Sequence, residues 1–186
     1  NHRYGVFEVG MSKSGEINRL SKMIKPHIGL ITNIGEAHIE NFKSIKEIAK
    51  AKSEIINNIL SKGTIILNRD DKFFGYLVRK AKLKNIKVVT FGMTKKANIY
   101  PIKINKFKEV TLITIKIINR IIKLKIKNIN IYNVLSSLAV LNELGLSFDK
   151  TKEIYKNFEP SDGRGKLHKI KRYKKLFRLI DESYNA

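Results

Sequence analysis

The sequence predicts an α/β fold in which a mostly parallel sheet is flanked by helices and carries a small antiparallel addition. In the first half of the chain, four short apolar runs alternate with segments of helical periodicity, and such alternation builds parallel sheets through right-handed crossovers. Further on, apolar and polar residues alternate strictly, as in antiparallel strands. With 186 residues, 42% hydrophobic and 29% charged, the chain can bury the core of one such domain and part of another.

The first half is expected to hold four strands and three helices. The strands are short β-rich or apolar runs at residues 4–9, 28–34, 64–67 and 87–91. The helices place apolar residues three or four positions apart and are expected at residues 16–26, 44–59 and 70–78. Ser44 is expected to cap the second helix, because its hydroxyl can accept a hydrogen bond from a free backbone N–H.

The second half begins with the alternating residues, which predict antiparallel strands at 111–117 and 122–127. They lie in a stretch, 95–127, that holds ten Lys or Arg and one Glu, and we expect its lysines to face solvent.

Two helices are expected next, one starting at Asn130 or Asn133 and one at 149–158. The composition of residues 159–163 is typical of a linker, and the strand expected at 176–180 begins a unit that the chain does not finish.

The formal net charge of +22, from 38 Lys and Arg against 16 Asp and Glu, raises the alternative of a nucleic-acid-binding protein. Residues 166–178 support it with seven Lys or Arg. Against it, Lys, Ile and Asn are over-used along the whole chain, as an AT-rich coding bias would produce, and the aromatic residues form no stacking platform. We therefore expect no nucleic-acid partner.

Cysteine is missing, which excludes disulfides, thiolate nucleophiles and cysteine-based metal sites. Lys or Arg interrupts every Ile-rich stretch before the roughly 20 residues needed to span a bilayer, so no membrane partner is expected. The chain enters a β-rich run almost at once and stops without a helix end. We expect an internal fragment of a longer protein that is cytoplasmic and monomeric.

Ligands of parallel α/β sheets bind beyond the carboxyl ends of the strands, and three residues are expected there. Glu8 ends the first run, His38 lies in the loop after the second, and Lys52 lies in the following helix. A carboxylate and an imidazole could share one divalent cation, whereas a capping Glu, a structural His and a solvated Lys are the simpler alternatives.

Six short runs match, in order, the motifs of one enzyme family. They read Glu-Val-Gly-Met with Gly-Glu-Ile at 8–17, Ile-Thr-Asn-Ile-Gly with Ala-His-Ile-Glu at 31–40, Ala-Lys-Ala-Lys-Ser-Glu-Ile at 49–55, Leu-Asn-Arg-Asp-Asp at 67–71, Gly-Arg at 163–164 and Asp-Glu-Ser-Tyr-Asn-Ala at 181–186. Each run is weak alone, but all of them in order are highly specific. By these motifs the chain resembles the Mur ligase family over nearly its whole length.

The resemblance implies a three-domain, ATP-dependent amide ligase. Residues 1–160 would be its central ATPase domain without the start, and 161–186 the hinge and first strand of its Rossmann-like C-terminal domain. In this family a substrate carboxylate takes the γ-phosphoryl group of ATP, and an amine attacks the resulting acyl phosphate. The best-matching members join D-alanyl-D-alanine to a UDP-N-acetylmuramoyl tripeptide in peptidoglycan synthesis. Folylpolyglutamate synthase, which shares the ATPase architecture, is an alternative.

The resemblance also assigns roles by position. Glu8 and His38 would bind Mg²⁺, and Lys52 would react with CO₂ to form a carbamate that helps hold a second Mg²⁺. Glu40 could orient His38. Arg164 and Asp181 match positions that contact ATP phosphate and ribose.

The remaining motif positions depart from the family or are ambiguous. The Gly-rich phosphate loop, expected upstream of Glu8, does not occur, so this chain alone is not expected to bind ATP tightly. A nucleotide-contacting Asn is replaced by Ser136, unless Asn133 substitutes for it, and Asn68, a candidate ATP contact, could equally be a plain turn residue. These departures leave open an inactive remnant as a third alternative.

Overall fold

A six-stranded sheet forms the body of the protein in a computed structural model that describes residues 2–36, 39–108, 110–127 and 129–185. Its strands follow chain order: β1 (Ile28–Ile31), β2 (Thr64–Asn68), β3 (Lys87–Phe91), β4 (Ile99–Lys106), β5 (Thr111–Ile117) and β6 (Arg120–Ile126). Pairing is parallel from β1 to β4 and antiparallel from β4 to β6. The predicted mostly parallel sheet with an antiparallel addition is therefore confirmed.

In the described part of the chain, five α-helices accompany the strands: α1 (Glu16–Ile24), α2 (Ile45–Lys52), α3 (Phe74–Leu83), α4 (Ile131–Glu143) and α5 (Lys152–Asn157). Short 3₁₀ turns lie at Ile39–Asn41, Ser53–Asn58, Asp149–Thr151 and Ser183–Asn185. Among the described residues, no helix has the length and apolar character needed to cross a bilayer.

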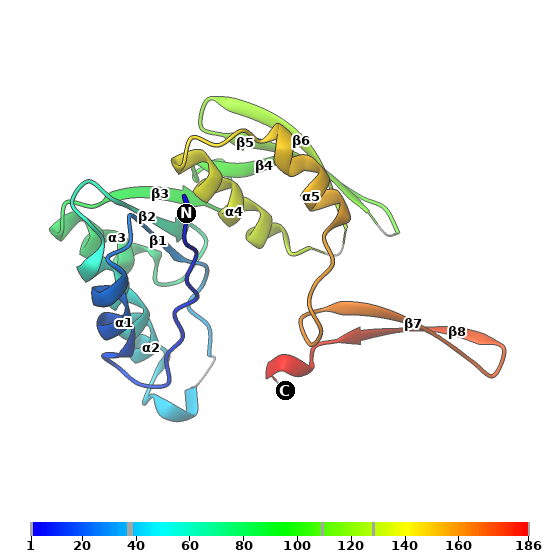
Figure 1. The fold of residues 1–186 in the computed structure, drawn as a ribbon, viewed down its shortest axis with the longest axis horizontal. Coiled ribbons are helices and arrows are strands. Elements are labelled where there is room, and N and C mark those ends of the chain that lie inside the picture. The colour runs from blue at the N-terminus through cyan, green and yellow to red at the C-terminus, as the bar shows by residue number, and fades with distance from the viewer. Residues whose placement is uncertain (1, 37–38, 109, 128, 186) are drawn as a thin grey trace.

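The core has two halves, one on each face of the sheet. α1, α2 and α3 lie together on one side of β1 and β2, whereas α4 packs on the other side and under β4 to β6 (Figure 1). β2 is buried along its whole length: Ile65 and Leu67 enter the first half, and Ile66 enters the second. Burial on both faces explains why this strand is a continuous apolar run rather than an alternating one.

The strand predicted at residues 4–9 does not form. The segment pairs with no strand in the described part of the chain, and the side chains of Val6 and Phe7 are exposed. A β-rich run becomes a strand only where a neighbour supplies the hydrogen-bond ladder, and among the described residues β1, the edge strand on this side, pairs with β2 alone.

The helix predicted at residues 44–59 is also shorter than expected. It turns into a 3₁₀ segment at Ser53, a buried residue whose hydroxyl donates to the carbonyl of Lys50 at 2.6 Å. Such back-bonding to a preceding carbonyl competes with regular helix geometry. Farther along, the alternatives for the start of α4 are decided, because the side chain of Asn130 accepts a hydrogen bond from the N–H of Tyr132 and caps the helix.

The strand predicted at 176–180 belongs to a hairpin, whose other strand is not predicted from the sequence. β7 (Lys166–Arg172) and β8 (Lys175–Asp181) pair as a separate two-stranded antiparallel sheet, which extends away from the six-stranded sheet (Figure 1). The chain enters this hairpin through Gly163, whose φ of 75° favours glycine, and a Cβ there would lie 2.9 Å from the backbone N of Tyr184.

Candidate functional site

The turn that follows β2 ties together the carboxyl end of the sheet. Asn68 accepts the N–H of Asp70 at 3.0 Å and donates to the carbonyl of Thr32, just beyond β1, at 3.2 Å. Asp71 accepts the N–H of Ile34 at 2.6 Å through one oxygen. Its other oxygen accepts the N–H of residue 73, which opens α3. Asn68 therefore links the ends of β1 and β2, and its contact with ATP stays a prediction.

Asp70 extends this network to β3 and α4. Its carboxylate accepts the N–H of Met93, beyond β3, at 2.6 Å and the hydroxyl of Tyr132, in the first turn of α4, at 3.1 Å. Burial, together with the charge and hydrogen bond of Asp70, raises the pKa of Tyr132. The network thus fixes the start of α4 against the edge where the strands end.

Lys52 reaches the same edge from the end of α2. Its Nζ donates to the carbonyl of Asn33, beyond β1, at 3.0 Å. Burial lowers the pKa of Lys52, while the negative charge of Asp71 acts in the opposite direction. A half-buried amine with a lowered pKa is neutral more often than a surface lysine, and a neutral amine is the nucleophilic form.

Glu8 is placed elsewhere by the structure. Its carboxylate is 86% exposed and lies 4.0 Å from the guanidinium of Arg164. That guanidinium in turn stacks over the ring of Tyr184 at 3.9 Å. Glu8 therefore lies beside the hinge, where it pairs with Arg164, although the two residues are far apart in the sequence.

The two predicted residues of the loop after β1 have different outcomes. His38 lies outside the described residues. Glu40 lies in the 3₁₀ turn and its carboxylate accepts the side-chain N–H of Asn41 at 3.1 Å, so the relation of Glu40 to His38 stays a prediction.

A groove of about 420 Å³ separates the start of α4 from the hinge and the β7–β8 hairpin. Its lining mixes polar and apolar side chains from both sides: Ile129, Asn130, Asn133, Phe158, Pro160, Ser161, Arg164, Gly165, Leu167, Ile180 and Glu182. Two predicted ATP-binding residues, Asn133 and Arg164, thus face one space. Ser136 does not join them, because it is buried and its hydroxyl donates to the carbonyl of Asn133 at 3.0 Å.

Asp181 holds the hinge rather than lining the groove. Its carboxylate accepts the hydroxyl of Ser183 at 2.7 Å, the N–H of Gly163 at 2.8 Å and the N–H of Ser183 at 3.1 Å. These hydrogen bonds, with a smaller contribution from His168, lower the pKa of Asp181. The bonds close the hinge onto the end of β8.

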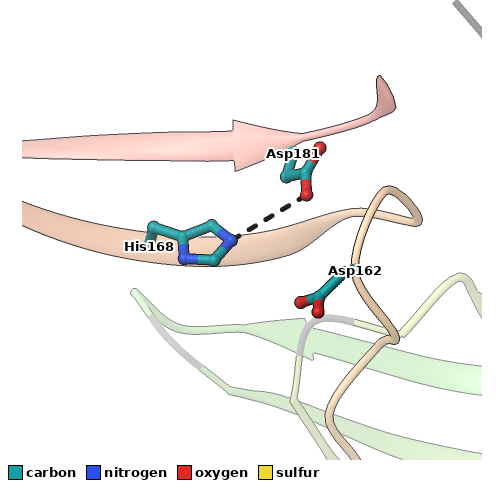
Figure 2. Close-up of side chains that lie close together, drawn as sticks. All are labelled: Asp162, His168 and Asp181. Atoms are coloured by element: carbon teal, nitrogen blue, oxygen red, sulfur yellow. Dashed lines mark ion pairs between the residues drawn. The ribbon is translucent and has the colours of Figure 1, made fainter. Parts of the chain in front are cut away.

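Figure 2 shows the cluster that this carboxylate forms with Asp162 and His168. One ligand atom of each residue lies within 4.8 Å of the others, a spacing that a cation could bridge. The Nε2 of His168 lies 4.0 Å from Asp181, whereas Asp162 is paired with the ammonium of Lys166 at 2.6 Å. Because Lys166 and the hinge N–H groups already engage both carboxylates, the cluster is an ion-pair network of the hinge.

Sequence reasoning missed the roles of Asp70, Asp71 and this cluster. The pair of aspartates was visible as a motif and as a helix start, but their acceptor roles depend on N–H groups more than twenty residues away. The cluster depends on the register of the hairpin, in which Lys166 is paired with Asp181.

Comparisons with known proteins agree with this architecture. Residues 1–141 match the family model described as the Mur ligase middle domain. A UDP-N-acetylmuramoyl-tripeptide–D-alanyl-D-alanine ligase of Rickettsia prowazekii is 31% identical over 189 aligned residues, which cover 98% of this chain and 41% of the relative. The chain therefore spans about two fifths of that relative's length.

Solved structures give the same result for the fold. A crystal structure of MurF from Acinetobacter baumannii is similar with a TM-score of 0.86 and 28% identity, over all of this chain and 40% of that one. A MurF ligase from Thermotoga maritima, solved in complex with ADP, has a TM-score of 0.77 at 23% identity over 96% of this chain and 40% of its own, and shows the shared fold alone.

Proposed function

Because this chain belongs to the Mur ligase family, we propose that it is the central part of an ATP-dependent ligase that joins D-alanyl-D-alanine to a UDP-N-acetylmuramoyl tripeptide. We assign residues 1–160 to the ATPase-type domain and 161–186 to the hinge and the start of the next domain, where the chain has the β7–β8 hairpin in place of a single strand. The relative of that activity, similar over 98% of the chain, supports this substrate pair.

The reaction has two steps. The terminal carboxylate of the tripeptide attacks the γ-phosphorus of ATP, which releases ADP and leaves an acyl phosphate. The amine of D-alanyl-D-alanine then attacks the acyl carbon, an amide bond forms, and phosphate leaves with the oxygen that had bridged carbon and phosphorus. The protein's task in such chemistry is to position the reactants and stabilise charge.

The observation that carries the proposal is the position of Lys52. The carboxyl end of a parallel sheet is where ligands of this fold class bind, and Lys52 brings a half-buried amine with a lowered pKa there. Reaction of the neutral amine with CO₂ forms an N–C bond and releases one proton, which gives a carbamate.

The residue types suit Mg²⁺, which prefers oxygen ligands. A carbamate on Lys52 would supply two oxygens, and Glu8 would supply a carboxylate if it exchanged its 4.0 Å pair with Arg164 of the hinge for a place beside Lys52. His38 would complete the set. Bound Mg²⁺ neutralises charge on the transferring phosphoryl group.

The groove between α4 and the hinge is assigned to ATP. Arg164 offers a planar guanidinium already oriented by Tyr184, a good match for phosphate oxygens. Asn133 offers amide donors and an acceptor to the same space. Asp181 stabilises the hinge beside this groove through the hydrogen bonds that it accepts from Gly163 and Ser183.

Phosphate release by the full-length protein tests this function. With ATP, Mg²⁺, UDP-N-acetylmuramoyl tripeptide and D-alanyl-D-alanine, release should occur and should fall to background when any one component is omitted. Release that needs a folate and glutamate instead would assign the chain to a folylpolyglutamate synthase. A folded protein without release under any condition would refute the proposal and favour an inactive remnant.

A further inference from the structure

The sheet formed by β4, β5 and β6 has two faces of opposite character. The inner face packs on α4 through buried Ile113, Ile115 and Leu124. The strand register defines the outer face, which we call the basic face. It consists of three rows: Tyr100, Lys116 and Ile121; Lys103, Thr114 and Lys123; and Asn105, Leu112 and Lys125.

Lysines dominate the charge of the basic face. Four of its nine residues are lysines and none is acidic. Some lysines on other surfaces pair with acids, as Lys87 does with Glu143 and Lys156 with Glu153. In the part of the chain that the structure describes, no such ion pair reaches the lysines of the basic face. Like charges on neighbouring rows repel, so they do not stabilise the isolated sheet.

Apolar side chains lie between these lysines. Leu112 is 43% exposed and Ile121 is 58% exposed, and Ile102, at the bulge of β4 beside the face, is 51% exposed. The over-use of Lys and Ile along the chain accounts for the lysines and for Ile102 and Ile121, but not for the exposure of Leu112 on the same face. An aqueous surface gains nothing from this combination of ammonium groups and aliphatic side chains.

The combination fits the surface of a bilayer better than it fits a nucleic acid. Anionic headgroups attract ammonium groups, while aliphatic side chains gain by entering the boundary between headgroups and acyl chains. A single-stranded nucleic acid would need aromatic platforms, and Tyr100, which is half-buried, is the one aromatic residue of the basic face.

We propose that the basic face docks on membranes rich in anionic lipid. The sequence predicts no membrane partner because no apolar run is long enough to span a bilayer. Binding to the membrane surface, however, does not require a membrane-spanning segment. The docked sheet would leave the carboxyl edge of β1 to β3 and the groove beside α4 outside the contact, because these lie on other parts of the molecule.

Vesicle sedimentation tests the docking. The full-length protein is mixed with vesicles of phosphatidylcholine containing 30% phosphatidylglycerol, and with pure phosphatidylcholine, at two salt concentrations. The triple variant Lys103→Gln, Lys123→Gln and Lys125→Gln removes three exposed charges of the basic face. The matched control, Lys22→Gln, Lys82→Gln and Lys84→Gln, removes three exposed charges from α1 and the end of α3.

Binding should require phosphatidylglycerol, weaken with salt, and fall roughly 100-fold in the basic-face variant while the control stays within about threefold of wild type. Equal losses in both variants would overturn the proposal, because net charge alone would then explain binding. Absence of vesicle binding by the wild type, or binding to single-stranded RNA that only the basic-face variant loses, would also overturn it.

Discussion

Replacing Asp71 by alanine should destabilise the protein through the loss of two backbone contacts. Its oxygens accept the N–H of Ile34 at 2.6 Å and that of Phe73 at 2.7 Å, and both bonds are partly buried. A hydrogen bond to a charged acceptor contributes about 1.5–3 kcal/mol, and partial exposure favours the lower end for each, so the loss should be about 3 kcal/mol. In the unfolding transition of a domain the size of this chain, that loss lowers Tm by roughly 6–12 °C.

Equilibrium urea unfolding and thermal unfolding of the full-length protein measure this loss. Asp71→Asn keeps one carbonyl oxygen as an acceptor and should lose about half as much. Asp162→Ala is the control, because it removes an exposed carboxylate whose solvent-exposed ion pair with Lys166 contributes little to stability. If Asp71→Ala were no less stable than Asp162→Ala, the proposal that the turn after β2 stabilises this end of the sheet through Asp71 would be refuted.

Three further predictions concern the site. Lys52→Ala should reduce phosphate release at least about 100-fold, with partial recovery in added formate or acetate, whereas Lys50→Ala, exposed on the same helix, should be unaffected; loss without recovery would contradict the carbamate role. Arg164→Lys should raise the KM for ATP about tenfold with little change in kcat, because the planar fork is lost; an unchanged KM would remove Arg164 from the nucleotide site. The pKa of Asp181 in the folded protein lies below its ordinary value of 3.8, because the ionised carboxylate is stabilised by its hydrogen bonds. The ionised carboxylate therefore stabilises the hinge fully above pH 3.8, and this stabilisation is lost as the pH falls through the lower pKa of the folded protein. The protection factor of the Gly163 amide, which is the intrinsic exchange rate at each pH divided by the observed rate, should therefore fall in acid, and in Asp181→Asn at every pH; a protection factor that ignores both changes would contradict the hinge role.

The parts of the fold that the sequence predicts are those set by burial patterns along the chain. β2 is a continuous run of apolar residues because both of its faces are buried, whereas β5 alternates because only one of its faces is buried. Both strands could therefore be predicted from the pattern of apolar residues. The exposed lysines of the antiparallel strands follow from the same alternation. Residues 4–9 carry an equally strong β-rich pattern, but pattern alone does not provide a partner strand, and that prediction is wrong.

The candidate site likewise has positions that the sequence predicts and positions that depend on distant segments. Lys52 could be predicted because its motif fixes its place on a helix that returns to the strand ends, and the structure brings it there. The joint position of Asn133 and Arg164 at one groove requires the hinge to fold back towards α4, which no local pattern encodes. The acceptor roles of Asp70 and Asp71 depend likewise on backbone groups of distant segments.

Oxygen tracing tests the proposed ligation chemistry most directly. The full-length protein is given ATP, Mg²⁺, D-alanyl-D-alanine and a UDP-N-acetylmuramoyl tripeptide whose terminal carboxylate carries ¹⁸O in both positions, and the released phosphate is analysed by mass spectrometry. The account predicts one ¹⁸O in each phosphate, because the oxygen that bridges carbon and phosphorus in the acyl phosphate leaves with phosphorus. Phosphate without ¹⁸O, released alongside the amide product, would contradict it.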